Sequence, residues 1–408
     1  MNRSLAEAVV AVLTRPSNGA AEQLATFPPR EWRSSMNWLF ASGLSLHLLL
    51  ALQELRAESV LPLHVAADLQ SAYVASAVRT EALFADVLQL NRSFYEGRLP
   101  FVNWKGFALV PQFSPDVRLR PLMDFDFIIN ADDAGKFDER LRNAGYQVCA
   151  RTSVETVYEK HRGAFHSVNQ IYRPNPYRRV ELHMGSDVII PGLQMPSFAG
   201  LLDRARVEQR RGQAFPVLCP EDAFLTHAAH IVKHVLSGSV RLCWLLELMT
   251  FVGSKTRSTK VDEHVRLHVG DKHLVWPIVG IALAVANAVF PTKVPSEFEP
   301  AIEAIPKSAA RWVRLHARTM ALSDPFSKLS LLLVREFMDA AQWKSYERSR
   351  VFPLRKAPRL VQAKTDSASG RVRSVWTQAQ FLTRVILLHI IENARYLLAR
   401  RKWSRSEV

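Results

Sequence analysis

The hydrophobic pattern of this chain changes near residue 98 and changes back near residue 218. Outside these positions, apolar residues recur three and four places apart, which is the spacing of amphipathic helices. Between them, short runs of aromatic and β-branched residues are separated by polar turns, a pattern typical of strands. The sequence therefore predicts an α+β fold, in which a small mixed β-sheet core is flanked by N- and C-terminal helical regions.

The chain has 408 residues, which is long enough for several structural units. We expect an N-terminal helical region over residues 1–98 and an α/β core over residues 99–217. A C-terminal helical region should follow over residues 218–345. Residues 346–408 then predict a basic linker and an amphipathic tail helix.

Local signals place individual elements inside the core and at its end. Residues 124–130, 146–152 and 178–186 are expected to be strands, because they are rich in β-branched and aromatic side chains. Residues 131–146 predict a helix with acids in its first turn and a glycine near its end. Residues 220–236 predict another helix, which begins with proline and two acids.

Two apolar stretches, residues 34–53 and 273–292, are long enough to be compared with membrane spans. A spanning helix needs about 20 predominantly apolar residues. The first stretch contains Asn, His, Gly and four Ser, and the second is interrupted by Pro277. We therefore expect both to be buried core helices. The N-terminal segment carries Glu7 and lacks a long apolar run, so it predicts a helix of the folded protein rather than a signal peptide.

The three cysteines, Cys149, Cys219 and Cys243, are far apart and show no metal-ligand spacing. An odd number of widely separated thiols fits a reducing compartment, so we expect a cytoplasmic protein, with peripheral membrane contact as an open alternative.

The net charge of +15 is concentrated near the C-terminus. From Ala341 to the end there are fifteen Lys or Arg against four acids, a net of +11, so the remainder is close to neutral. The charge therefore gives no indication of a specific nucleic-acid partner. The expected tail helix, about Val375 to Lys402, combines an apolar face with flanking basic residues. Such a helix suits either an anionic membrane surface or packing on the body of the protein with its arginines solvated.

The best candidate for chemistry is a pair of aspartates at the start of a predicted strand. Asp124 and Asp126 share one face because strand side chains alternate, and Glu181 and His183 share a face for the same reason. If these strands are neighbours, three carboxylates converge. Two unit charges 4 Å apart repel by about 4 kcal/mol at an effective dielectric of 20. Protonation, basic partners or a divalent metal such as Mg²⁺ would have to offset this repulsion. Two other interpretations remain open. The Asp-x-Asp pair could occur by chance, and Glu181 could be a partly exposed strand residue.

Several motifs occur here in a recognisable order. They are "WKGFALVPQF", "RPLMDFDFIIN", "NAGYQV", "VELHM", "PEDAFLTHAAHIVKH" and "RLCWLLEL". This ordered set resembles a bacterial family of uncharacterised nucleotidyltransferases, which belongs to the DNA polymerase beta-like nucleotidyltransferase superfamily. The resemblance covers roughly Phe101 to Phe251, with a looser fit to the helical region before it.

The resemblance implies metal-dependent transfer of a nucleoside monophosphate from a nucleoside triphosphate (NTP) to a hydroxyl acceptor. Asp124, Asp126 and Glu181 would be the catalytic carboxylates and the ligands of Mg²⁺ or Mn²⁺. Glu181 would also help to deprotonate the acceptor hydroxyl. The motifs do not encode the acceptor, but the association of this family with surface-polysaccharide genes favours a sugar or a glycan precursor.

The same resemblance places Lys105 and Gly106 where the superfamily has a phosphate-binding Gly-Ser turn, so the Ser is missing here. Lys105 either supplies charge to the phosphates or is solvated. Arg120 either holds phosphate or pairs with Asp124. His183 is expected to orient a carboxylate or to pack in the core rather than to bind metal.

His227, His230 and His234 lie along one face of a predicted helix. Zinc sites usually draw their ligands from more than one element, so we expect this face to pack beside the core, where His230 or His234 reaches substrate. Two rival functions remain. One is a binding or scaffold protein that keeps the fold without catalysis, and the other is a membrane- or polyanion-binding protein that acts through its tail.

Overall fold

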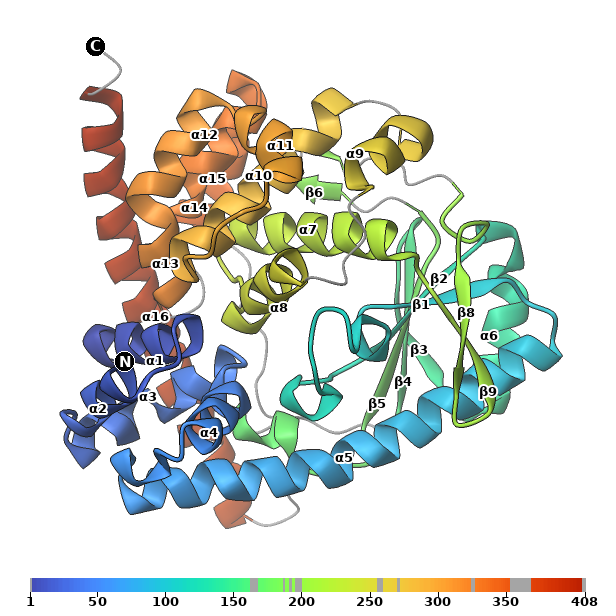
Figure 1. Ribbon diagram of the computed structural model, residues 1–408, viewed down its shortest axis with the longest axis horizontal. Helices are drawn as coiled ribbons and strands as arrows, with labels where there is room; N and C mark the ends of the chain where they lie inside the picture. The colour runs from blue at the N-terminus through green and yellow to red at the C-terminus, as the bar shows by residue number, and fades with distance from the viewer. Residues whose placement is uncertain are drawn as a thin grey trace.

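The computed structural model describes residues 2–161, 168–185, 188–190, 193–194, 200–254, 260–269, 272–323, 327–352 and 368–405. Figure 1 shows a mixed sheet with helical regions on either side of it along the chain. The sheet has seven strands in the order β3-β4-β5-β2-β1-β9-β8, and β6 pairs with β7 in a separate two-stranded sheet. This arrangement confirms the predicted α+β fold class.

The bounds of the strands are β1 (Phe101–Trp104), β2 (Phe125–Ile129), β3 (Gln147–Arg151), β4 (Glu155–Lys160), β5 (Arg178–His183), β6 (Val188–Ile190), β7 (Leu193–Gln194), β8 (Arg206–Arg210) and β9 (Gln213–Val217). The three predicted strands are therefore confirmed as β2, β3 and β5. The sequence prediction missed β4 and β8, whose side chains are mostly polar, and also β9, which pairs with β8 in a hairpin. The hairpin turn, Arg211-Gly212, has positive φ at both residues, as two-residue hairpin turns of type I′ require.

The N-terminal helices are α1 (Arg3–Thr14), α2 (Asn18–Ala25), α3 (Pro29–Ala41), α4 (Ser45–Glu54) and α5 (Leu63–Glu96). α1 buries Leu5 and Val9, so this segment is a helix of the folded protein, as the sequence predicts. α5 runs from the N-terminal helices to the sheet (Figure 1). Its first half joins the helical core through Leu69, and its second half joins the sheet core through Phe94.

The C-terminal helices are α7 (Pro220–Ser237), α8 (Leu242–Gly253), α9 (Val261–His264), α10 (Lys272–Val289), α11 (Glu299–Glu303), α12 (Lys307–Trp312), α13 (Arg318–Leu322), α14 (Ser330–Val334), α15 (Ala340–Val351) and α16 (Ala368–Arg405). Inside the core, α6 (Ala134–Asn143) follows β2, where a helix is predicted. π-helical turns extend α9 over Val265–Val269 and join α12 to α13 over Val313–Ala317.

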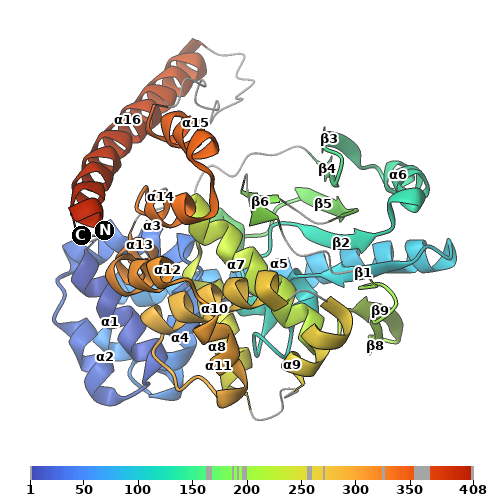
Figure 2. The same ribbon diagram turned by 90° about the horizontal axis from the view of Figure 1, so that it is seen from above.

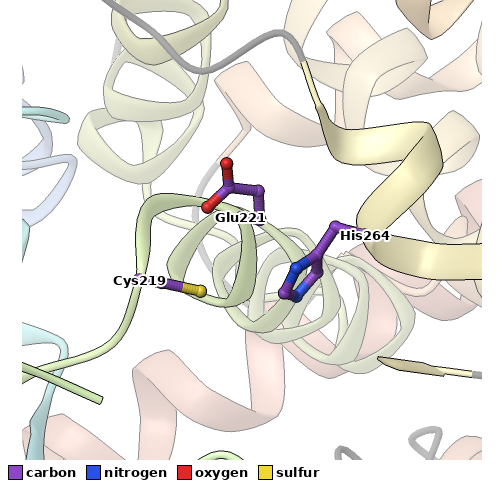
Figure 3. Close-up of side chains that lie close together, drawn as sticks. All are labelled: Cys219, Glu221 and His264. Carbon is purple, nitrogen blue, oxygen red and sulfur yellow. The ribbon is translucent and has the colours of Figure 1, made fainter. Parts of the chain in front are cut away.

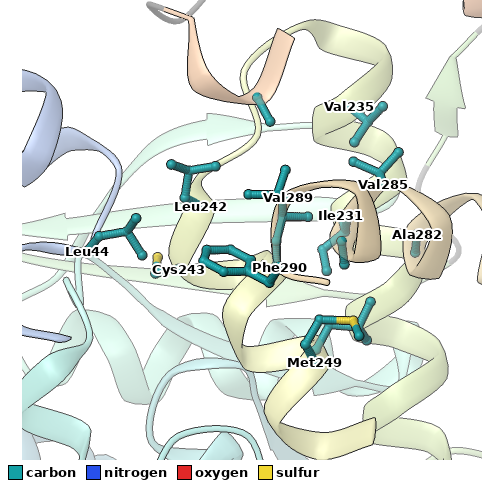
Figure 4. Close-up of a cluster of buried hydrophobic side chains, with 14 of the residues drawn as sticks. Leu44, Ile231, Val235, Leu242, Cys243, Met249, Ala282, Val285, Val289 and Phe290 are labelled. Carbon is teal, nitrogen blue, oxygen red and sulfur yellow. The ribbon is translucent and has the colours of Figure 1, made fainter. Parts of the chain in front are cut away.

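The helix that most directly supports the site is α7. It begins with Pro220 at its first position and acids in its first turn, as predicted. It ends at Gly238, whose φ of 76° closes the helix in the left-handed conformation. A Cβ at Gly238 would lie 2.2 Å from the Ser327 carbonyl oxygen, so only glycine fits there. Figure 4 shows apolar side chains of α7, α8 and α10 packed together, Ile231 and Val285 among them.

Both apolar stretches are core helices, as predicted. The first is broken into α3 and α4, which meet at 108°, and Gly43 with φ of 79° lies at the break. A Cβ at Gly43 would lie 2.4 Å from the Cys243 Sγ, so the break packs directly on α8. Among the described residues no single helix is long and apolar enough to span a membrane, and only the bent α3–α4 pair meets those criteria jointly.

α16 begins at Ala368, earlier than the predicted start at Val375. Within residues 346–408, where the sequence predicts a basic linker and this tail helix, residues 353–367 lie outside the described residues. The C-terminal part of α16 packs on the body, where Tyr396 and Trp403 are buried (Figure 2). The proposed division into four units remains a prediction, and α5 contributes to both cores.

Candidate active site

The two strands predicted to carry the carboxylates are neighbours. β2 and β5 are parallel, with Asp126 opposite Glu181 and Ile128 opposite His183. Asp124 lies immediately before β2. Because residues that face each other on adjacent strands project from the same side of the sheet, the Asp126 and Glu181 carboxylates converge. Together with Asp124 they line a cavity of about 290 Å³.

Asp126 is the centre of a small charged network. Its Oδ1 accepts a hydrogen bond from Lys105 Nζ at 2.9 Å and lies 3.0 Å from His183 Nε2. The same His183 nitrogen is 3.8 Å from Glu181 Oε2. Glu181 Oε1 accepts a hydrogen bond from Arg179 Nε at 2.8 Å. His183 therefore contacts both carboxylates, which agrees with an orienting role, and its ring meets the Trp104 ring edge-on.

The pKa values within the cluster diverge. Burial raises the pKa of Glu181 to about 8, with further contributions from Asp126 and Asp124. Burial and the Asp126 carboxylate raise the pKa of Asp124 to about 6. Burial alone would also raise the pKa of Asp126, but Lys105 and His183 outweigh it and lower that pKa to about 2. A further positive charge would therefore be needed for all three carboxylates to be fully ionised at neutral pH.

The donor set suits a hard divalent cation. One ligand atom from each of Asp126, Glu181 and His183 can be chosen so that all lie within 4.8 Å of one another. Carboxylate oxygens are the protein ligands that Mg²⁺ prefers. The Lys105 ammonium group lies beside Asp126 and balances part of its negative charge. Asp126 and Glu181 could therefore hold a metal, and Asp124 is placed to join them.

The predicted Lys-Gly turn follows β1 directly. Lys105 and Gly106 both have positive φ, 58° and 45°, and a short 3-10 helix begins at Gly106. Lys105 Nζ also lies 3.9 Å from the centroid of the Trp104 ring. Its side chain is 19% exposed and ion-paired with Asp126, so the solvated alternative for Lys105 is wrong.

Arg120 does not pair with Asp124, so that alternative is also wrong. Its Nε donates to Glu247 Oε1 at 2.6 Å and a terminal nitrogen donates to Oε2 at 3.2 Å. The other terminal nitrogen donates to the Gly106 carbonyl oxygen. Both partners of this ion pair are buried, at 7% and 1% exposed. Arg120 therefore ties the Lys-Gly turn to α8, a partner that nearby sequence could not reveal.

The three histidines of α7 divide between two roles. His227 is buried against the Phe113 ring, and its Nε2 lies 3.6 Å from Glu247 Oε2. Burial lowers the pKa of His227 to about 4, so this ring is neutral at pH 7. His230 and His234 instead line the cavity, as expected for a face that packs beside the core.

Sequence reasoning identified His230 and His234 but assigned no cavity role to the other lining residues at α7 and α8, which are Lys233, Arg241, Cys243, Trp244 and Glu247. We call His230, Lys233, His234, Arg241 and Trp244 the helical wall, because all of them line the cavity from these two helices or the residue that caps α8. The spacing of Arg241, Trp244 and Glu247, three residues apart in "RLCWLLEL", was a signal that could have found part of it.

A second cluster, Cys219, Glu221 and His264, also brings possible metal ligands together (Figure 3). The buried Asp222 carboxylate accounts for much of this arrangement. Its Oδ2 accepts from Cys219 Sγ at 3.3 Å and its Oδ1 lies 2.8 Å from His264 Nε2. Arg204 donates to both of its oxygens. We therefore interpret this cluster as structural: its contacts with Asp222 stabilise the first turn of α7.

Comparison with known protein families gives one match. A family described as "Uncharacterised nucleotidyltransferase" matches residues 28–291, which includes β1 to β9 and the helical wall. No curated protein matches this chain.

Proposed function

We propose that this chain, which belongs to the uncharacterised nucleotidyltransferase family, transfers a nucleoside monophosphate from an NTP to a hydroxyl acceptor with the help of a divalent cation. Family membership supports nucleotidyl transfer as the general activity. The observation that carries the finer proposal is the convergence of Asp124, Asp126 and Glu181 on one cavity across two paired strands. Such a cluster fits a site for Mg²⁺ and phosphate oxygens.

A divalent cation bound by these carboxylates would neutralise charge on the triphosphate and orient its α-phosphate. Glu181 is the candidate base for the proton of the acceptor hydroxyl, because its carboxylate lines the same cavity and lies opposite Asp126 on the adjacent strand. His183 holds the Asp126 carboxylate in position. The acceptor oxygen then bonds to the α-phosphorus, the bond from this phosphorus to the bridging oxygen breaks, and pyrophosphate leaves.

The Lys-Gly turn supports phosphate binding in a manner that differs from a Gly-Ser turn. Lys105 is a flexible point charge that already lies in the cavity and contacts Asp126. With a cation at Asp126, the Lys105 ammonium group would be released towards the phosphates. Arg120 contributes indirectly, because it is held by Glu247 and fixes the Gly106 carbonyl.

Binding and transfer assays test this proposal. The wild-type protein is incubated with Mg²⁺ or Mn²⁺ and each of four α-labelled NTPs, and binding and transfer to a panel of hydroxyl acceptors that includes sugars are measured. We expect the Asp124→Asn plus Asp126→Asn variant to lose metal-dependent NTP binding. Unchanged binding in this variant would remove the catalytic proposal. Binding without transfer to any acceptor would favour the binding or scaffold protein.

A second function is supported by the exposed surface of α16. Large apolar side chains project from its first two thirds into solvent, with Trp376 65%, Ile386 57% and Ile390 60% exposed. Arg384 lies within the same segment. A helix with an apolar face and basic residues suits the surface of an anionic membrane. We propose that α16 attaches the protein peripherally to such a surface.

Vesicle sedimentation tests this second proposal. The Ile386→Ser plus Ile390→Ser variant should bind vesicles of phosphatidylcholine and phosphatidylglycerol more weakly than the wild type. Val207→Ser is the matched control, because Val207 is 59% exposed on β8. Equal binding of all three proteins, or equal binding to vesicles without phosphatidylglycerol, would contradict the proposal.

A further inference from the structure

A second cavity lies where the C-terminal part of α16 meets the body of the protein. Its volume is about 660 Å³, against about 290 Å³ for the candidate active site, and ligand sites commonly measure about 300–1,000 Å³. The start of α1, the π-helical turn between α12 and α13, and the last turns of α16 are among the segments that line it. Figures 1 and 2 both show the end of α16 beside α13. The functions proposed above use none of the residues that line this cavity.

Much of the cavity wall is apolar. Leu315 on the π-helical turn and Leu398 on α16 both line the cavity, yet their side chains are 51% and 60% exposed. The buried Trp403 is also part of the wall, and the Arg311 guanidinium lies 4.4 Å from the centroid of its ring. Leucine side chains that line a cavity but stay open to solvent favour an apolar ligand. The wall therefore suits a hydrocarbon chain.

The same cavity is basic. Among the described residues that line it none is acidic and four are basic, namely Arg3, Arg311, Arg395 and Lys402. Glu7 Oε1 lies 3.8 Å from Arg3 Nε, and Arg3 also donates to the Thr319 hydroxyl at 3.1 Å. Arg395 donates to Glu392 Oε1 at 2.7 Å. Both of these arginines are more than half exposed, where ion pairs are weak, and a guanidinium has five N–H donors. A phosphate can therefore be bound beside the existing partners.

The exposed apolar surface of α16 continues to this cavity. Leu387, Ile391 and Leu398 are all exposed. Spacings of four and seven residues keep side chains on one face of a helix. This apolar stripe therefore runs from the part of α16 that is proposed to lie on a membrane to the cavity at the end of the helix.

We propose that this cavity binds one anionic phospholipid from the membrane to which α16 attaches. Its acyl chains lie against Leu315 and Leu398, and its phosphate pairs with Arg3 and Arg395, because a guanidinium can donate two parallel hydrogen bonds to phosphate oxygens. This inference rests on the second proposed function, which supplies the membrane. Arg3 and Leu315 belong to the body and the other two residues to α16, so the bound lipid joins the helix to the body.

Calorimetric titration of the full chain with a short-chain phosphatidylglycerol tests the cavity without a bilayer. The lipid is kept below the concentration at which it forms micelles. We expect saturation at one lipid per chain. Phosphatidylcholine of the same chain length should bind about tenfold more weakly, because its choline group places a further positive charge beside the basic residues.

Two variants probe the two parts of the cavity. Arg3→Gln plus Arg395→Gln should raise the Kd for phosphatidylglycerol about tenfold or more, because charged hydrogen bonds are lost. Leu315→Ser should raise it about fivefold or more, because the acyl chains lose an apolar contact. Circular dichroism establishes that each variant is folded. Matched controls, all exposed and outside the cavity lining, are Arg30→Gln plus Arg33→Gln on α3 and Leu63→Ser at the start of α5.

The Ile386→Ser plus Ile390→Ser variant separates the cavity from the membrane-binding surface. It should bind the soluble lipid as tightly as the wild type, since neither residue lines the cavity, although it binds vesicles more weakly. If the wild type binds vesicles but the folded cavity variants bind soluble phosphatidylglycerol as tightly as the wild type, the lipid assignment is wrong and the membrane proposal stands. If a fatty acid of the same chain length binds as tightly as phosphatidylglycerol, the ligand is a free fatty acid and the phospholipid assignment is overturned. If the wild type binds neither vesicles nor soluble lipid, both proposals fall.

Discussion

Replacement of Glu181 by glutamine should stabilise the metal-free protein at alkaline pH, although it removes a candidate catalytic group. Burial and the neighbouring aspartates raise the pKa of Glu181 from 4.5 to about 8. The folded pKa lies above the unfolded value, so the wild type loses stability as pH rises from about 4.5 to about 8. Glutamine cannot ionise, so Glu181→Gln should not show this loss.

The size of the effect follows from the shift. At about 1.4 kcal/mol per pKa unit, ionised Glu181 costs the folded state about 5 kcal/mol at high pH. The full value requires the side chains to keep their positions, so a stabilisation of about 2–5 kcal/mol is expected. Bound Mg²⁺ should stabilise the wild type at pH 8 and should stabilise Glu181→Gln less, because ligand binding to the folded state shifts the unfolding equilibrium.

Urea unfolding followed by tryptophan fluorescence measures these stabilities between pH 5 and about 9, with a chelator or with Mg²⁺. Glu155→Gln is the matched control, because Glu155 lies on the adjacent strand β4 and lines the same cavity. The same pH dependence in the wild type and in Glu181→Gln would refute the reasoning, because it would mean that Glu181 is not held in a cluster of interacting carboxylates.

Three further predictions concern the framework of the site. Glu247→Ala should lower the free energy of unfolding by about 3–5 kcal/mol, because it leaves the buried Arg120 without its carboxylate, and urea unfolding would show this loss. His227 has a pKa lowered by burial to about 4, so its contribution to stability should be complete above pH 6.5 and should be lost as pH falls towards 4. The loss, about 3 kcal/mol, should be absent from a pH series on a folded His227→Gln variant. Gly238→Ala should destabilise by at least about 1–2 kcal/mol, since alanine disfavours the left-handed conformation, and the contact with the Ser327 carbonyl adds to this cost. Gly253→Ala, where a Cβ meets nothing within 4 Å, should change the melting temperature little.

Local sequence patterns predicted the elements that are marked by their own residues rather than by contacts with distant parts of the chain. The start of α7 could be identified from Pro220 and the acids after it, and β2 from its apolar run. β4 and β8 were missed because pairing with neighbouring strands, rather than an apolar pattern, makes them strands. The break at Gly43 was also missed, because it depends on the approach of Cys243.

The same distinction applies to the site. By itself, the sequence determined the fold class, and strand alternation placed Asp124 with Asp126 and Glu181 with His183, since the direction of side chains along a strand is a local property. Only the tertiary structure decided that β2 and β5 are neighbours, that Arg120 pairs with Glu247, and that the helical wall lines the same cavity as the carboxylates. These contacts join residues more than fifty positions apart, and the packing of the whole chain sets them.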